Sequence, residues 1–178
     1  MEATIANTPP QIDTHQSHDE GKRERSTIEF PYTDLEDAEN IVTAVHALGG
    51  GSSCEWNTLA GKVGAAPEGG AFRSRMTAAR MFGLLRYEKD QVTLTDLGLR
   101  ICDPQQQKAA RVGAFLSVPL YAKVYELFNG KTLPPVTGLE ATIGTLGVVP
   151  KQRERARQAL QRSAKQAGFF DFGHERLA

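Results

Sequence analysis

The chain has 178 residues, of which 40% are hydrophobic and 24% charged, and its 21 basic side chains balance 21 acidic ones. This composition is typical of one medium or two small globular domains, and no apolar run approaches the roughly 20 residues that span a membrane. No basic segment followed by an apolar run stands at the N-terminus, and the cysteines lack CxxC spacing, so we expect a cytoplasmic protein with reduced thiols.

Residues 1–29 are polar and contain hardly any large apolar side chain. Such a segment cannot bury enough surface to offset the entropy lost on ordering, so the sequence predicts a disordered tail. The tail also holds an excess of acidic residues, which leaves the rest of the chain mildly basic. Phe30-Pro31-Tyr32 marks the start of the first folded domain, over residues 30–103.

The first domain is predicted to contain helices and one hairpin. The expected elements are helices over residues 33–48, 52–63, 70–84 and 95–100, and a β-hairpin over residues 84–95. Thr33 and Glu36 stand at capping-box spacing before the first helix, and Ser52 and Glu55 repeat this spacing before the second. Apolar and β-branched residues flank a polar turn at residues 88–91, which is typical of a hairpin.

This order of elements resembles the winged helix-turn-helix family. Residues 59–64 are similar to the family's second helix and turn, residues 70–85 to its recognition helix, and residues 84–94 to its wing. The resemblance implies DNA binding by a bacterial-type transcriptional regulator. Winged helices also serve as protein-binding modules, so the resemblance leaves that alternative open.

A second domain is expected over residues 104–178. Its predicted elements are helices over residues 104–117, 120–128, 137–146 and 150–167, followed by a strand from Phe169 to Phe172. Thr137 and Glu140 again stand at capping-box spacing, and Pro150 suits the first turn of a helix. The chain ends soon after the strand, so we expect no return strand and a truncated wing.

The second domain repeats motifs of the first. Residues 59–67 (LAGKVGAAP) match residues 142–150 (TIGTLGVVP), and residues 79–87 (ARMFGLLRY) match residues 164–172 (AKQAGFFDF). A spacing of about 80 residues is too long for a solenoid repeat and indicates a duplicated small domain. The predicted fold is therefore mainly α with a small β-hairpin, built from two tandem winged-helix-like units.

The candidate DNA-binding residues lie on the two predicted recognition helices and on the wing. A helix in the major groove needs short polar or guanidinium side chains to reach bases, with cations beside them for phosphates. The outer face of the first helix offers Arg73, Ser74, Thr77 and Arg80, and the wing offers Lys89. The second helix region carries six cations against the single acid Glu154, and its candidates are Lys151, Arg155, Arg162 and Lys165. These side chains equally suit the solvated face of a structural helix.

Other chemistry finds little support in the sequence. The run from Gly49 to Ser53 follows a predicted helix and lacks the Gly-Lys-Ser/Thr of a phosphate-binding loop. Cys54 and His46 have no third group that would make a nucleophile, and no His/Cys pair has metal-ligand spacing. We therefore expect no enzyme, metal or cofactor. The main hypothesis is a regulator that binds duplex DNA. The alternative is a tandem winged-helix module that binds protein, or that dimerises through the apolar faces of residues 104–128.

Overall fold

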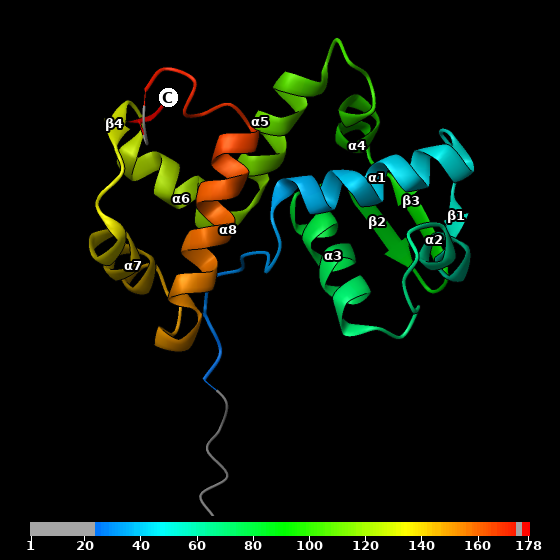
Figure 1. Cartoon of the computed structure of the whole chain (residues 1–178), viewed down its shortest axis with the longest axis horizontal. Coiled ribbons are helices and arrows are strands. Elements are labelled where there is room, and N and C mark those ends of the chain that lie inside the picture. Colours follow the sequence, from blue (N-terminus) through cyan, green and yellow to red (C-terminus); the bar gives the residue numbers. More distant parts are fainter. Residues whose placement is uncertain (1–23, 174–175) are drawn as a thin grey trace, which may run out of the picture.

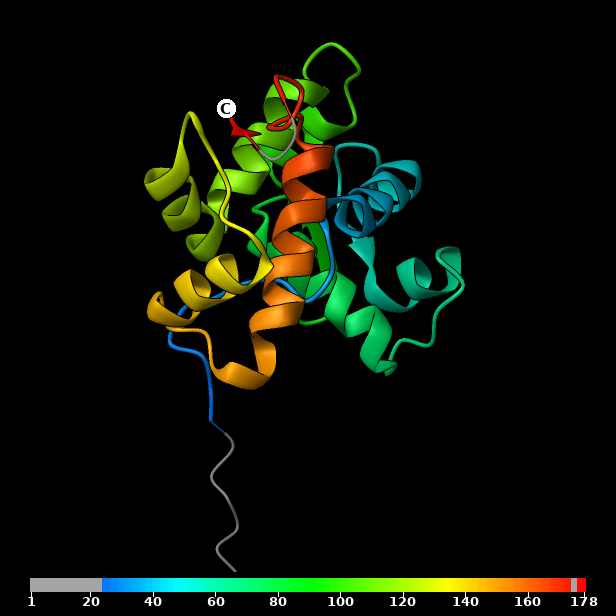
Figure 2. The same ribbon diagram turned by 60° about the vertical axis from the view of Figure 1, so that its left-hand side comes forward.

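Each half of the chain supplies one set of helices and short strands, and the two sets lie side by side (Figure 1). The computed structural model describes residues 24–173 and 176–178. Over these residues the chain is mainly helical with small antiparallel sheets, as the sequence predicts. Figure 2 shows α8 (Arg153–Gln166) between the elements of the second half and those of the first.

The first half forms α1 (Leu35–Gly49), β1 (Cys54–Glu55), α2 (Trp56–Lys62), α3 (Gly70–Met81), β2 (Leu85–Glu88), β3 (Gln91–Leu94) and α4 (Asp96–Ile101). The predicted hairpin is confirmed, because β2 and β3 pair antiparallel from Leu85–Leu94 to Glu88–Gln91. The short strand β1 adds to the other edge of β3 and gives the order β1-β3-β2. Helix α1 packs against α3 and this sheet.

The helix starts differ from the predicted capping boxes. Asp34, and not Thr33, caps α1 by accepting a hydrogen bond from the Asp37 amide at 3.2 Å. Glu55 itself caps α2, because pairing of residues 54 and 55 with β3 delays the start of the helix. Capping residues are interchangeable in sequence, so neighbouring contacts decide which one begins the helix.

The second half forms α5 (Gln107–Ser117), α6 (Pro119–Phe128), β4 (Lys131–Thr132), α7 (Val136–Thr145), the 3₁₀ turn η1 (Pro150–Gln152), α8 and β5 (Arg176–Leu177). The predicted strand over residues 169–172 is wrong, since these residues form turns after α8. Among the described residues, no strand pairs with residues 169–172 to form a hairpin like β2–β3. Strand β5 pairs antiparallel with β4, as β3 does with β1 in the first half.

The duplicated glycines explain why the motif is repeated. Gly64 and Gly147 both follow a helix and have φ values of 64° and 110°, and Gly83 and Gly168 have φ values of 71° and 84°. A side chain strongly disfavours this region, and glycine adopts it freely. The repeat therefore preserves the residues that end corresponding helices in the two halves.

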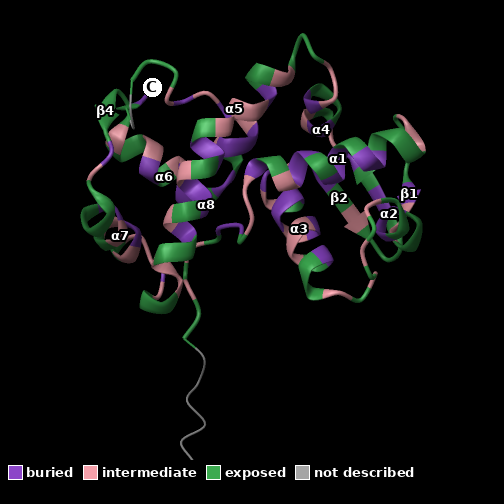
Figure 3. Ribbon diagram, in the orientation of Figure 1, coloured by how far each residue is buried: buried purple, intermediate pink, exposed green. Residues whose placement is uncertain are grey.

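One hydrophobic core is continuous across both halves, and Figure 3 shows buried positions in the helices of each. The apolar face of α5 and α6 belongs to this core. Its fully buried members are Ala110, Ala114, Phe115, Leu120, Tyr121 and Val124. Most apolar side chains of the surface suggested for dimerisation over residues 104–128 are therefore covered within the chain, although Leu127 is exposed.

Residues 24–34 form an extended strap between α3 and α8 (Figure 1). The Thr27 amide donates to the Gly147 carbonyl at 2.9 Å, and the Ser26 hydroxyl donates to Gln152 Oε1 at 2.7 Å. Residues 24–29, assigned to the disordered tail from sequence, are thus tied to the second half. The remainder of the predicted tail, residues 1–23, lies outside the described residues.

Candidate nucleic-acid interface

The outer face of α3 lines a hollow in the protein surface. Arg73 is exposed there, Ser74 and Thr77 are half-buried, and Met81 adds an apolar side chain. Arg73 forms an ion pair with Glu68, just before the helix. Arg80 is exposed on α3 but is not among the residues that line this hollow. Three of the four side chains predicted to contact bases therefore face the hollow together.

The opposite wall of this hollow comes from the strap and the start of the α8 region. We call the whole depression between α3 and this wall the α3 hollow, and its volume is about 610 Å³. Its lining outside α3 consists of Arg25, Ser26, Ile28, Glu29, Phe30, Pro31, Tyr32 and Gln152. The predicted recognition surface thus has a wall beside it, which the sequence does not indicate.

A second, smaller hollow adjoins the first at Tyr32 and Gln152, which line both. This α8 hollow has a volume of about 440 Å³ and is also lined by Lys151, Glu154, Arg155 and Gln158. Gln152 Nε2 donates to the Tyr32 hydroxyl at 2.8 Å. The Arg155 guanidinium carbon lies 5.2 Å from the centroid of the Tyr32 ring, in cation–π geometry. The fold therefore brings α3 and the start of α8 to one continuous surface.

The rest of the basic surface of α8 is partly paired, contrary to the sequence expectation. Arg157 Nε lies 2.7 Å from Glu140 Oε1 on α7. Arg162 Nε lies 2.9 Å from Asp34 Oδ2 at the start of α1. Glu154 is the only acid within this helix region, but Glu140 and Asp34 from other elements pair with two of its six cations. The predicted role of Arg162 in DNA binding therefore competes with a structural role.

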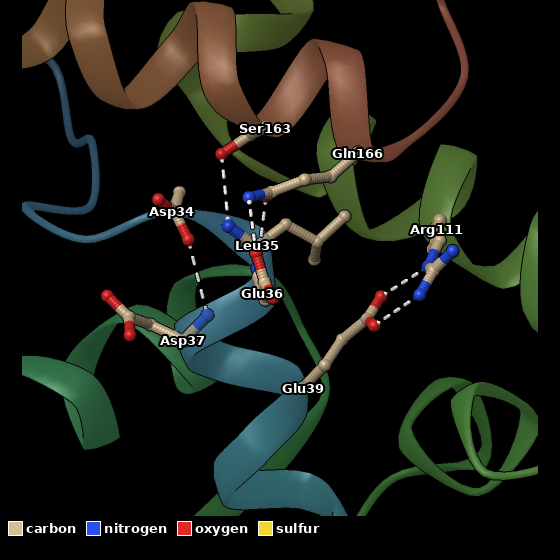
Figure 4. Close-up of polar contacts among 8 residues, drawn as sticks. All are labelled: Asp34, Leu35, Glu36, Asp37, Glu39, Arg111, Ser163 and Gln166. Atoms are coloured by element: carbon tan, nitrogen blue, oxygen red, sulfur yellow. Dashed lines mark hydrogen bonds and ion pairs between the residues drawn. The ribbon is translucent and has the colours of Figure 1, made fainter.

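Helix α8 also caps α1, as Figure 4 shows. The Leu35 amide donates to the buried Ser163 hydroxyl at 3.1 Å, and the Glu36 amide donates to Gln166 Oε1 at 3.0 Å. These bonds satisfy amides that the first turn of a helix leaves without partners. The inner face of α8 thus holds the two halves together, and only its outer face remains for a ligand.

At the start of α1, neighbouring acids and cations act on the pKa of Asp37 in opposite directions. Burial raises the pKa of Asp37 above its ordinary value, and the nearby carboxylate of Asp34 raises it further. The cations Arg75 and Arg162 oppose this rise. The positive charges of Arg162 on α8 and Arg75 on α3 therefore stabilise the negative charges at the start of α1.

Two further predicted residues lie away from the hollows. Lys89 is exposed at the tip of the β2–β3 hairpin, where it has a positive φ of 54°. Lys165 is exposed in the last turn of α8. Neither is among the residues that line the α3 or α8 hollow. Like Arg80, they are exposed cations outside both hollows.

A bidentate ion pair between Glu39 on α1 and Arg111 on α5 leads to a stability prediction (Figure 4). Both hydrogen bonds measure 2.7 Å, and the Glu39 side chain is only 11% exposed. Glu39→Ala would leave the half-buried Arg111 guanidinium unpaired. We expect the free energy of unfolding to fall by about 2 kcal/mol in urea denaturation, between the values for exposed and buried pairs.

Glu126→Ala is the matched control for this prediction. It removes an exposed ion pair with Lys123 on α6, so we expect a change of less than about 0.5 kcal/mol. In the double variant Glu39→Ala/Arg111→Ala, the loss should be smaller than the sum of the two single losses. Additive losses would show that the two side chains contribute to stability independently.

Neither cysteine has a lowered thiol pKa. Burial raises the pKa of Cys54 and of Cys102, and the carboxylates of Glu55 and Glu39 respectively add to this effect. Among the described residues, no group of three or more His, Cys, Asp or Glu side chains is placed to hold a metal ion. Over the same residues no helix has both the length and the apolar character needed to cross a membrane.

Sequence reasoning missed the strap as part of this surface. Tyr32 and Gln152 join the two hollows, and Arg25 adds a cation from the segment predicted to be disordered. The run Phe30-Pro31-Tyr32, with two aromatic residues, is the one signal that could have indicated burial near this point. The chain matches no protein-family model, no curated protein and no solved structure.

Proposed function

We propose that the chain is a DNA-binding protein, and that it acts as a bacterial-type transcriptional regulator in the cytoplasm. The observation that carries the proposal is the shared surface of α3 and α8. Arg73, Ser74 and Thr77 line one hollow, and Lys151 and Arg155 line the hollow adjoining it. Base-reading side chains beside phosphate-binding cations are what a duplex requires.

The order of elements supports a winged-helix interpretation of the first half. Helix α1 is followed by β1, α2, α3 and the β2–β3 hairpin, and the sheet has the order β1-β3-β2. In this interpretation α3 is the recognition helix and the hairpin is the wing. In the second half, α6, β4, α7 and α8 follow the same order as α1, β1, α2 and α3, with a reduced sheet, which supports a tandem arrangement.

The contacts divide the candidate residues into three groups. Arg73, Ser74 and Thr77 suit base edges, because they share the outer face of α3. Lys151 and Arg155 suit phosphates, because they are exposed and lie outside the ion pairs that hold α8. Arg80, Lys89 and Lys165 lie outside both hollows, so only a bent or long duplex would reach them. Arg162 is assigned mainly to stability through its contact with Asp34.

Fluorescence anisotropy of the full chain with random-sequence duplex DNA tests this proposal. Four cations at the two hollows, Arg25, Arg73, Lys151 and Arg155, would release counterions and give a log–log salt slope of about −3 to −4. The variant Lys151→Glu/Arg155→Glu should weaken binding at least about tenfold and reduce the magnitude of the slope by about 2. Ser74→Glu/Thr77→Glu should weaken binding without touching the Arg73–Glu68 pair.

Lys123→Glu/Lys131→Glu is the control for charge alone. It makes the same change in net charge on α6 and β4, away from both hollows, so the affinity for DNA should change little. Equal losses in this control would show that binding depends on net charge and not on the proposed surface. Absence of binding even at low salt would overturn the proposal and favour the protein-binding alternative.

A further inference from the structure

The larger hollow is more apolar than a surface for DNA requires. Ile28, Phe30 and Pro31 from the strap and Met81 from α3 contribute to its lining. Phe30 and Pro31 are buried, so the wall that they form is fixed in the core and does not depend on exposed side chains. Phosphates and sugars gain nothing from such a wall.

The size of this hollow is that of a small-molecule site. Its volume of about 610 Å³ falls within the range of about 300–1,000 Å³ for ligand pockets. Such sites combine an apolar lining with a few polar groups that fix the orientation of the ligand. Here the hydroxyls of Ser74 and Thr77 and the amide of Gln152 supply these groups.

The α3 hollow also carries Arg25, Glu29 and Arg73 on its lining, whereas the adjoining α8 hollow lacks its cluster of apolar side chains. The α8 hollow is lined by Lys151 and Arg155, with Glu154 as the acid among its lining residues. The phenol of Tyr32 and the amide of Gln152 stand between the two hollows and are hydrogen-bonded to each other. A largely apolar hollow with charged residues on its lining therefore opens next to a polar hollow with two cations, across the Tyr32–Gln152 boundary.

We propose that the two hollows form one binding site for a small amphipathic organic acid. Its apolar body would lie in the α3 hollow against Ile28 and Met81. Its carboxylate would pass the Tyr32–Gln152 boundary and pair with Lys151 and Arg155, because the charges are complementary. The ligand would cover the outer face of α3, where the proposed function places DNA, but its binding does not depend on DNA.

Titration of the full chain with 6-phenylhexanoate, in the absence of DNA, tests the site. The matched neutral probe is 6-phenylhexanamide, which has the same apolar body without the charge. We expect the acid to bind about tenfold more tightly than the amide, because a carboxylate makes charge-assisted hydrogen bonds with Lys151 and Arg155. In NMR spectra the backbone amides of Ile28, Tyr32 and Thr77 should shift with either probe.

Two variants test separately the contacts of the charged end and of the apolar end of the ligand. Lys151→Gln/Arg155→Gln should bring the affinity for the acid down to that for the amide and leave the amide unchanged. Thr77→Trp should fill the larger hollow and weaken both probes about tenfold. Lys123→Gln/Lys131→Gln, which alters cations outside both hollows, should leave both affinities unchanged. Thermal denaturation of each variant would establish that it is folded.

Several results would overturn the inference. Equal affinities of the acid and the amide for the unaltered chain would remove the role of the cationic hollow. Shifts confined to other parts of the chain, or binding unaffected by Thr77→Trp, would place the probe elsewhere. Absence of binding up to about millimolar probe, a concentration at which even weak ligands bind, would do the same. Because no DNA is present, failure of the chain to bind DNA would not produce any of these results.

Discussion

Replacing Gly98 with alanine is expected to lower the free energy of unfolding by about 3 kcal/mol, at the upper end of the usual cost of overpacking. Gly98 lies in the middle of α4, against the backbone of Leu84 just before β2. A Cβ atom at this position would lie 3.0 Å from the Leu84 carbonyl carbon and collide with its oxygen. Backbone, and not a flexible side chain, therefore stands in the way.

The Leu84 carbonyl cannot move aside easily, because Thr95 fixes the two segments together. The Thr95 amide donates to the Leu84 carbonyl at 3.0 Å. The Thr95 hydroxyl donates to the Gly83 carbonyl at 2.7 Å and accepts from the Gly98 amide at 3.1 Å. If the backbone moved to relieve the collision, the hydrogen bonds of Thr95 at the start of α4 would break. The alanine variant would then lose stability through these lost hydrogen bonds instead of through the steric clash.

Gly61→Ala is the control, and its expected effect has the opposite sign. Gly61 also lies within a helix, α2, but no atom stands within 4 Å of a Cβ built there. Alanine should therefore stabilise the chain by up to about 1 kcal/mol through helix propensity alone. Urea denaturation followed by circular dichroism would measure both. A Gly98→Ala variant as stable as the unaltered chain would show that α4 can shift away from β2.

The sequence predicts the elements well because their signals are local. The hairpin over residues 84–95 and the cap at Thr95 depend on residues close to one another along the chain. Where prediction fails, a distant partner decides. Residues 54 and 55 pair with β3, and the turns at residues 169–172 replace a strand although their aromatic pattern favours one.

The candidate site is predicted less completely for the same reason. Periodicity on α3 correctly groups Arg73, Ser74 and Thr77 on one face. Nothing in the local sequence shows that Asp34 reaches Arg162 across 128 positions, or that the strap covers part of this face. Contacts between the two halves therefore convert part of an apparently free basic helix into a structural element. The polar composition of residues 24–29 hides this role, because Ser26 and Thr27 are held through hydroxyl and backbone hydrogen bonds.

The aromatic centre of the second half leads to the other large expected effect. Phe115 on α5 is fully buried, with its ring centroid 5.0 Å from that of Tyr121 and 4.7 Å from that of Phe169. Phe115→Ala should lower the free energy of unfolding by about 4 kcal/mol, because it removes a large apolar group and leaves a cavity between packed helices. For a chain of this length, the melting temperature should fall by about 10 °C.

Phe172→Ala separates this effect from the loss of an aromatic side chain as such. Phe172 follows the same turn as Phe169 but is 80% exposed, so its removal should change stability by less than about 0.5 kcal/mol. Thermal denaturation of both variants gives the comparison. Phe115 contacts Phe169, which follows α8, and α8 in turn caps α1 through Ser163. A loss of stability in Phe115→Ala as small as that in Phe172→Ala would contradict this prediction. It would mean that contacts with α1 and α7 alone maintain the position of α8, and that the hollows do not depend on the aromatic centre.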